Sequence, residues 1–137
     1  HYVLDYESIF KNEVMDDFAD SYMRGETPIP CVKCNQSVKF RDLFKVAKDL
    51  NADALVTGHY VQRIGNEMHM AADKNKDQSY FLHRLNQAQL ARTLFPLGEI
   101  TKNEVRRLAH ALGLPNAAKK DSTGIGCLLQ KCVNSQF

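Results

Sequence analysis

Residues 36–60, QSVKFRDLFKVAKDLNADALVTGHY, decide the fold class of this chain. The first half predicts a helix beginning near Gln36, because its apolar residues recur every three or four positions, at Phe40, Leu43, Phe44, Ala47 and Leu50. The second half predicts a short buried strand over residues 54–57, ending in Gly58 and His59. A helix followed by such a strand is typical of an α/β domain, and ligands bind at these strand ends in open α/β sheets.

The residues before this stretch predict a strand, a helix and a stiff loop. HYVLDY, residues 1–6, is expected to form a short strand. A helix should follow up to Gly25, because apolar residues recur at every fourth position, at Tyr6, Phe10, Val14, Phe18 and Tyr22. Pro28 and Pro30 push the residues before them toward extended geometry, so residues 27–31 are expected to be extended.

The residues after it predict short elements joined by turns. Residues 60–72 alternate around Gly65-Asn66, which favours a hairpin, and Asp77 is a suitable N-cap for a helix over residues 79–85. Further along we expect a short helix over residues 86–93, an extended stretch over 94–100, and a helix that starts with the T-x-x-E capping box of Thr101 and stops at Gly113.

The bulk composition excludes some classes of protein. A net charge of +2 is too small to indicate nucleic-acid binding without a local basic patch. The sequence has no apolar run long enough to span a membrane and no secretory signal pattern at its start. The four cysteines therefore read as thiols or metal ligands rather than as structural disulfides. The missing initial methionine suggests a fragment of a longer chain.

The cysteines allow three chemistries. Cys31 and Cys34 form a C-x-x-C, and Cys127 and Cys132 form a C-x4-C near the other end. Structural zinc, iron–sulfur ligation, and thiol redox or sulfur transfer all remain open, as does the alternative that some cysteines are small buried residues, which suits Cys132. Cys34 lies just before the expected helix, where the helix dipole should lower its thiol pKa.

Three other groups of residues are candidates for binding. Lys119 and Lys120 precede Cys127 and would attract an anion, His59 lies at a strand end, and the loop with Lys76 is mixed in charge. Each has an ordinary alternative as a solvated loop or a structural histidine. Residue types alone thus predict an α/β domain with thiol chemistry and name no substrate.

Four segments together resemble the tRNA-specific 2-thiouridylase family. They are TPIPCVKCNQSVKF (27–40), DALVTGHYVQR (53–63), ADKNKDQSYFL (72–82) and LFPLGEITKNEVRRLAHALGLPNAAKKDSTGI (94–125). The resemblance implies an α/β PP-loop ATPase domain, Rossmann-like and similar to adenine nucleotide alpha hydrolases. Residues 1–125 would be its second, C-terminal half, and residues 126–137 an atypical tail, frameshifted or truncated.

The resemblance also implies an activity. The family replaces the C2 oxygen of the wobble uridine in Lys, Glu and Gln tRNAs with sulfur. ATP with Mg²⁺ adenylates that oxygen, and a cysteine persulfide loaded by an upstream sulfur carrier delivers the sulfur. A second cysteine attacks the persulfide or captures the product as a disulfide. The family implies a cytoplasmic enzyme, or a mitochondrial one in eukaryotes, with no membrane association.

Site residues carry over by motif. Cys34 matches the nucleophilic cysteine of N-P-D-x-x-C-N, and Cys127 is the nearest match to the persulfide cysteine of S-T-G-I-C-F. Ile29, Pro30 and Cys31 match the stretch beside the target base, and Gly58 matches an ATP contact. The positions that match tRNA contacts are His59, Lys76, Asp77 and Gln78.

This chain departs from the family pattern in three places. Ile29 and Cys31 replace the Asn and Asp of the first motif, as in a subtype in which Cys31, Cys34 and Cys127 would ligate a [4Fe–4S] cluster; no other metal site is expected. Cys127 comes one position late, after an extra glycine. The SGGVDSS-type phosphate loop is absent from the sequence, so we expect the chain alone neither to bind ATP tightly nor to thiolate tRNA. The alternatives are a metal- or cluster-binding module and another PP-loop ligase, such as one similar to argininosuccinate synthase.

Overall fold

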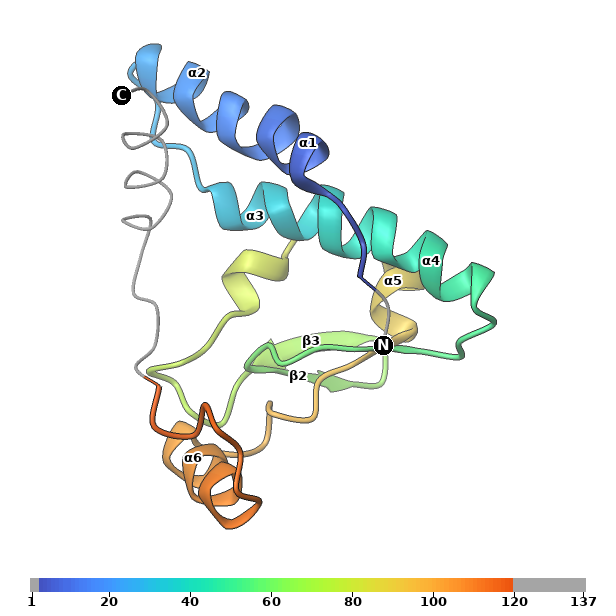
Figure 1. The fold of residues 1–137 in the computed structure, drawn as a ribbon, viewed down its shortest axis with the longest axis vertical. Coiled ribbons are helices and arrows are strands. Elements are labelled where there is room, and N and C mark those ends of the chain that lie inside the picture. Colours follow the sequence, from blue (N-terminus) through green and yellow to red (C-terminus); the bar gives the residue numbers. More distant parts are fainter. Residues whose placement is uncertain (1–2, 120–137) are drawn as a thin grey trace. The chain divides into compact units, whose positions relative to one another are not determined.

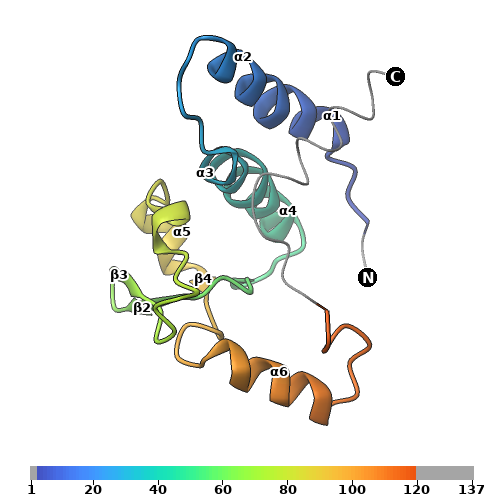
Figure 2. The ribbon, with the colours of Figure 1, turned by 90° about the vertical axis from the view of Figure 1, so that its left-hand side faces the viewer.

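The computed structural model describes residues 3–119 (Figures 1 and 2). The chain divides into two compact units, His1–Val105 and Arg106–Phe137, and each is described by itself. The first unit contains every helix and strand up to the start of the last described helix. The described candidate residues up to Gln78 therefore belong to this unit, whereas Lys119 belongs to the second.

The first helix runs without a break from Glu7 to Met23, as α1 (Glu7–Phe10), the π-helical segment η1 (Lys11–Asp16) and α2 (Asp17–Met23). Gly25 follows with a φ of 77°, and its N–H donates to the carbonyl of Tyr22 at 3.0 Å. This left-handed end, which glycine adopts without strain, confirms the predicted helix stop. The strand predicted over residues 1–6 is wrong for its described part, because residues 3–6 are irregular and Val3 is 86% exposed. Apolar residues that find no partner strand gain nothing from extended geometry.

The second helix begins at Pro30 and not near Gln36. It consists of α3 (Pro30–Cys34), the π-helical segment η2 (Asn35–Asp42) and α4 (Leu43–Asp49). Ile29 is extended as predicted, with φ −116° and ψ 88°, but Pro30 occupies the first helical turn. Proline suits that position because its fixed φ is already helical and the first helical N–H groups have no intrahelical partner. Cys31 and Cys34 are consequently helical residues and not loop residues.

Two small sheets lie after this helix. Strand β1 (Leu55–Val56) pairs in parallel with β4 (Thr93–Leu94), and β2 (Val61–Ile64) pairs in antiparallel with β3 (Glu67–Met70). Gly65 has a φ of 59° in the turn of the hairpin, which confirms that prediction. The parallel pair confirms the α/β expectation. The predicted extended stretch over residues 94–100 is mostly a turn, since only its first residue lies in β4.

The remaining described elements are short helices. They are the 3₁₀ helix η3 (Ser79–Leu82), α5 (Gln87–Ala91) and α6 (Lys102–Ala111). The residue that precedes η3 is Gln78, so the predicted N-cap at Asp77 is wrong. The predicted capping box is confirmed for its Thr101 half, because the hydroxyl accepts from the N–H of Glu104 at 3.3 Å. No residue of α6 is buried among the described part of the chain, so its apolar residues form no core face there.

The core of the first unit lies where η2, the hairpin and η3 meet. Phe40, Val61 and Leu82 are buried there. Partly buried residues pack around them, namely Phe44, Leu55, Met68, Leu85 and Phe95. The cysteine-bearing helix is therefore anchored to the hairpin and to η3 by apolar contacts. None of the helices within residues 3–119 combines the length and apolarity needed to cross a bilayer.

Candidate functional site

The described thiols of the candidate site lie on one helical turn. Cys31 is exposed, Cys34 is partly buried, and both are free thiols. Residues three apart on a helix share a face, which explains why the charge of Cys31 influences the ionisation of Cys34. Cys127, the predicted partner of Cys34, lies outside the described residues, as do Cys132 and Lys120.

The pKa of Cys34 is raised, which contradicts the predicted lowering. Burial is the largest cause; the nearby Lys39 lowers the pKa of Cys34 and Cys31 raises it. The prediction placed Cys34 before a helix start, whereas it is the fifth helical residue, so its position relative to the first-turn amides differs from the one assumed. The effect of burial exceeds that of the Lys39 charge and favours the neutral thiol. At neutral pH the thiol is thus protonated, and it needs a base before it can act as a nucleophile.

Asn35 fixes the turn that carries Cys34. Its side chain is buried, and its Nδ2 donates to the carbonyl of Phe81 at 3.1 Å. The Oδ1 of Asn35 has no hydrogen-bond partner among the described residues. This bond joins the cysteine helix to η3 across a long stretch of sequence. Residue patterns alone gave no signal for it, because the acceptor is a main-chain carbonyl.

His59, three residues after strand β1, is held neutral. Its ring packs against Phe40, with the ring centroids 6.1 Å apart, and its Nδ1 contacts the hydroxyl of Thr57. Burial lowers the pKa of His59 to about 4, and Lys39 contributes in the same direction. The predicted RNA contact at His59 would therefore be a neutral hydrogen bond and not a charge interaction.

Lys39 connects two predicted site residues that are distant in the sequence. Its positive charge lowers the pKa of Cys34 and the pKa of His59. The helix segment η2 therefore brings one ammonium group near both the thiol and the end of the strand. Sequence reasoning missed Lys39; its position one helical turn after Cys34 was the signal that could have found it.

The loop with Lys76, Asp77 and Gln78 lies beside Tyr60, which directly follows His59. The main-chain N–H of Tyr60 donates to Gln78 Oε1 at 2.9 Å, and the N–H of Gln78 donates to the carbonyl of Tyr60 at 2.9 Å. The Asp77 carboxylate accepts from the N–H of Ala71 at 2.8 Å and from the hydroxyl of Ser79 at 2.6 Å. The structure thus brings Gln78 next to the segment that holds His59. Asp77 and Gln78 have clear structural roles in shaping this loop.

The described residues differ in how well they fit the implied cofactors. Gly58 is exposed, and a Cβ there would meet only the Leu97 side chain at 3.7 Å, so a ligand can approach its backbone. Within residues 3–119 no group of three or more His, Cys, Asp or Glu side chains is placed to hold a metal ion. Cys31 and Cys34 would supply two ligands of a cluster, which needs three or four thiolates.

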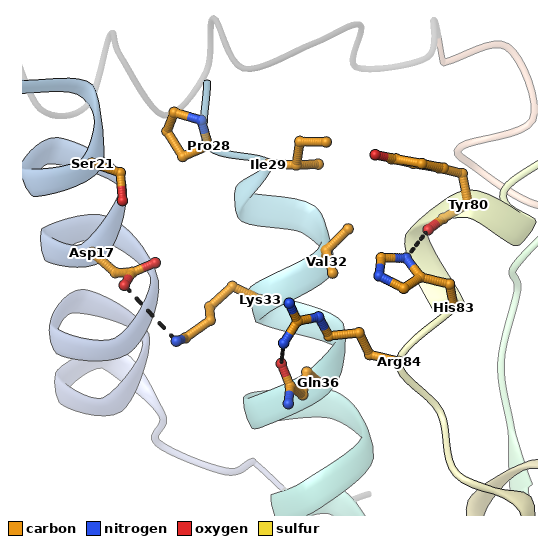
Figure 3. A pocket seen from close by; sticks show the side chains of 10 residues that line it. All are labelled: Asp17, Ser21, Pro28, Ile29, Val32, Lys33, Gln36, Tyr80, His83 and Arg84. Atoms are coloured by element: carbon orange, nitrogen blue, oxygen red, sulfur yellow. Dashed lines mark hydrogen bonds and ion pairs between the residues drawn. The ribbon is translucent and has the colours of Figure 1, made fainter. Parts of the chain in front are cut away.

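A groove opens beside the cysteine helix, with a volume of about 390 Å³ (Figure 3). Pro28 and Ile29 lie at one end of it, and the other walls come from α2, the cysteine helix and the η3 segment. Charged and polar side chains point into it, chiefly Asp17, Lys33, Gln36, Tyr80, His83 and Arg84. The predicted target-base residue Ile29 therefore borders a polar groove.

Comparisons with known proteins agree on one family. Residues 1–131 match the family model described as the tRNA methyl transferase HUP domain. The tRNA-specific 2-thiouridylase MnmA of Rickettsia bellii (strain OSU 85-389) is 60% identical over 129 residues, covering 91% of this chain and 35% of that protein. The proteins of the same name from Rickettsia africae (strain ESF-5) and Rhodospirillum centenum (strain ATCC 51521 / SW) are 57% and 58% identical over 129 residues, again 91% of this chain, and 35% and 33% of their lengths.

The chain thus spans about a third of the length of these relatives. The family model, in contrast, matches nearly all of this chain. The matched HUP domain is PP-loop ATPase-like, as the resemblance implied. The parallel pairing of β1 with β4 agrees with that fold class. The chain therefore belongs, through its HUP domain, to the tRNA-specific 2-thiouridylase family.

Proposed function

We propose that this chain is the sulfur-transfer portion of a tRNA 2-thiouridylase, in which Cys34 acts on the wobble uridine site. The supporting observation is the position of Cys34, which is partly buried on the helix whose first turn follows Ile29 and lies near Lys39. The substrates would be the Lys, Glu and Gln tRNAs. The sulfur would come from an upstream persulfide carrier, and the enzyme would work in the cytoplasm, or in mitochondria of a eukaryote.

The proposed chemistry uses two thiols in sequence. ATP with Mg²⁺, when bound near Gly58, supplies the adenylate that makes the uridine C2 oxygen a leaving group. The terminal sulfur of a persulfide on Cys127 then bonds to C2 as AMP departs. The Cys34 thiolate attacks the Cys127 sulfur, which breaks the sulfur–sulfur bond, forms a Cys34–Cys127 disulfide and leaves the thiocarbonyl on the base. An external thiol must reduce that disulfide before the next turnover.

The raised pKa of Cys34 assigns a role to Lys39 in this scheme. The thiol has to lose a proton only after the persulfide has reacted, so a protonated resting state prevents premature attack. The ammonium of Lys39 stabilises the thiolate when it forms, because it already lowers the pKa of Cys34 against the effect of burial. Lys39 is therefore proposed to assist the thiol without being a proton acceptor itself.

Two names point to different transferred groups. The matching family model is described as a methyl transferase domain, whereas the relatives are described as thiouridylases. Sulfur transfer is favoured for this chain because it carries a cysteine pair on a helix next to the groove, and sulfur relay needs such thiols.

Cys31 supports a version of the same function in which sulfur transfer depends on an iron–sulfur cluster. Cys31 replaces the aspartate of the related motif and lies close enough to Cys34 to raise its pKa. Cys31, Cys34 and Cys127 would then ligate a [4Fe–4S] cluster that binds the sulfur to be donated. Anaerobic purification followed by iron and sulfide analysis separates the two versions. Iron that is lost in Cys31→Ser would establish the cluster version, and iron-free active protein would exclude it.

A chimera tests the proposed function directly. This chain would replace the matching 129-residue segment of the Rickettsia bellii relative, and 2-thiouridine would be measured in a transcribed Lys tRNA with ATP and a sulfide or persulfide source. We expect ATP-dependent thiolation that Cys34→Ser abolishes while nucleotide binding persists. A folded chimera without thiolation, or with full activity in Cys34→Ser, would refute the proposal.

A further inference from the structure

The groove bounded by α2, the cysteine helix and η3 is lined by cations and by an exposed aromatic ring. Its lining cations, Lys33 and Arg84, outnumber its single carboxylate, Asp17. The exposed ring of Tyr80, 60% accessible, extends over the groove on the side facing Ile29 (Figure 3). Cations combined with an accessible aromatic ring are the features that bind unpaired nucleotides, through phosphate contacts and base stacking.

Arg84 is the cation that is available to a ligand. Its guanidinium points into the groove and its one described contact is a long hydrogen bond, 3.4 Å, to Oε1 of Gln36 (Figure 3). Lys33, in contrast, is paired with Asp17 at 3.8 Å, and both side chains are about half exposed. Arg84 therefore keeps its charge unneutralised among the described residues, while Asp17 competes with any anion for Lys33.

Tyr80 and His83 form the aromatic wall of the groove. Their ring centroids are 5.6 Å apart, and the Nδ1–H of His83 donates to the carbonyl of Tyr80 at 2.7 Å. This bond fixes the imidazole against the backbone of η3 and so supports the tyrosine ring. The hydrogen bond from Asn35 to the Phe81 carbonyl joins η3, which carries Tyr80, to the helix that carries Cys34.

We propose that this groove binds an unpaired nucleotide of the tRNA anticodon loop next to the target uridine, with its base on Tyr80 and its phosphate on Arg84. The inference rests on the proposed function, because it takes tRNA as the substrate. It assigns four residues to RNA positioning: Tyr80, His83, Arg84 and Lys33. A neighbour held in this way would steer the target base toward Ile29 and Cys34, so the four are positioning residues and not catalytic ones.

RNA binding by the 137-residue chain is the first test. The probe is a fluorescent anticodon stem-loop, compared with the same stem closed by a short tetraloop, at several salt concentrations. Tyr80→Leu is expected to weaken stem-loop binding at least about fivefold, which corresponds to the loss of one stacked base. Arg84→Ala is expected to weaken it and to reduce the salt slope by about one.

Matched controls outside the groove remove the same groups. Tyr22→Leu removes an exposed tyrosine of α2, and Arg63→Ala removes an arginine of β2, so neither should change stem-loop binding more than about twofold. Asp17→Asn should strengthen RNA binding, because it frees Lys33 from its ion pair. Asp49→Asn removes the same negative charge from α4, away from the groove, and should not strengthen binding. Equal effects of groove and control variants would overturn the proposal, as would ATP competing with RNA in an Arg84-dependent way.

The chimera separates failure of the groove from failure of the proposed function. Tyr80→Leu and Arg84→Ala should raise KM for tRNA at least about fivefold while kcat changes little, because they act on binding of a neighbouring nucleotide. Thiolation with unchanged KM in both variants would refute the groove and leave the proposed function standing. A chimera that binds RNA through the groove but never thiolates would refute the function alone.

Discussion

Cys34 is a thiol whose reactivity depends on a cation one helical turn away. Burial raises its pKa and Lys39 opposes that effect, so removing Lys39 should raise the pKa further. We expect Lys39→Ala to slow iodoacetamide alkylation of Cys34 about two- to threefold at pH 8, followed by mass spectrometry, because only the thiolate reacts. Lys45→Ala, on the same helix, should leave the rate unchanged, and equal rates in Lys39→Ala and wild type would show that the charge does not reach the thiol.

His59 should make the protein less stable in mild acid. Its pKa is about 4 in the folded chain against 6.5 ordinarily, so the unfolded chain binds the extra proton between these values. Protonation of His59 therefore leaves the free energy of unfolding unchanged well above pH 6.5 and lowers it as the pH decreases toward 4. The loss is about 1–2 kcal/mol after a discount for the part of the ring that solvent reaches. The difference between the urea midpoints at pH 7 and pH 4.5 should be smaller in His59→Asn than in the wild type. Protonation of carboxylates changes both proteins equally, so it cancels in this comparison.

Sequence motifs identified these residues but did not supply their environments. Cys34 and His59 were assigned from segment resemblance, whereas the predicted direction of the Cys34 pKa was wrong, because burial of the thiol raises that pKa and the helix starts at Pro30 rather than just after Cys34. The residue before a proline is extended, and Ile29 confirms it, but a proline can also be the first residue of a helix. The apolar spacing became regular only from Phe40 onward, so the earlier turns gave no periodic signal.

Among the elements, the turn after β4 holds the hairpin through a close backbone contact. A Cβ on Gly98 would lie 2.0 Å from the carbonyl oxygen of Val61, and neither backbone can move aside as a flexible side chain would. The Gly98 carbonyl also accepts from the N–H of Ala72 at 2.8 Å. We expect Gly98→Ala to destabilise the chain by about 3 kcal/mol or more, measured by urea unfolding.

Gly65 provides the matched comparison for that measurement. Its φ of 59° favours glycine, but a Cβ there would meet no atom within 4 Å. Gly65→Ala should therefore cost only about 1–2 kcal/mol, the ordinary penalty of a left-handed residue. A Gly98→Ala cost no greater than this would show that the turn can move away from Val61. The sequence predicted the Gly65 turn from its neighbours, but the Gly98 contact joins elements that no local pattern connects.

At the scale of the whole molecule, local patterns predicted the elements better than their partners. Helix faces and the hairpin follow from periodicity and turn residues within a few positions. A strand was also predicted near residues 54–57, but the observed β1 is only Leu55–Val56, and its predicted burial is wrong because Val56 is 61% exposed. The pairing of β1 with β4 and the Asn35 bond to Phe81 depend on packing across about forty residues, which periodicity does not encode. The strand predicted over residues 1–6 is wrong for its described residues 3–6 for the same reason, since strand formation requires a partner.

The chain covers about a third of its relatives, and nucleotide binding is where we expect that difference to matter most. No SGGVDSS-type loop occurs in its sequence, and backbone amides in such a loop are what hold phosphates. We predict that calorimetry with Mg²⁺-ATP detects no binding tighter than about millimolar to the 137-residue chain, whereas the chimera binds at least about tenfold more tightly. RNA binding by the isolated chain should persist, because the groove lies wholly within its first unit. Tight ATP binding by the chain alone would show that residues around Gly58 suffice for the nucleotide, and it would remove the reason for expecting the isolated chain to be inactive.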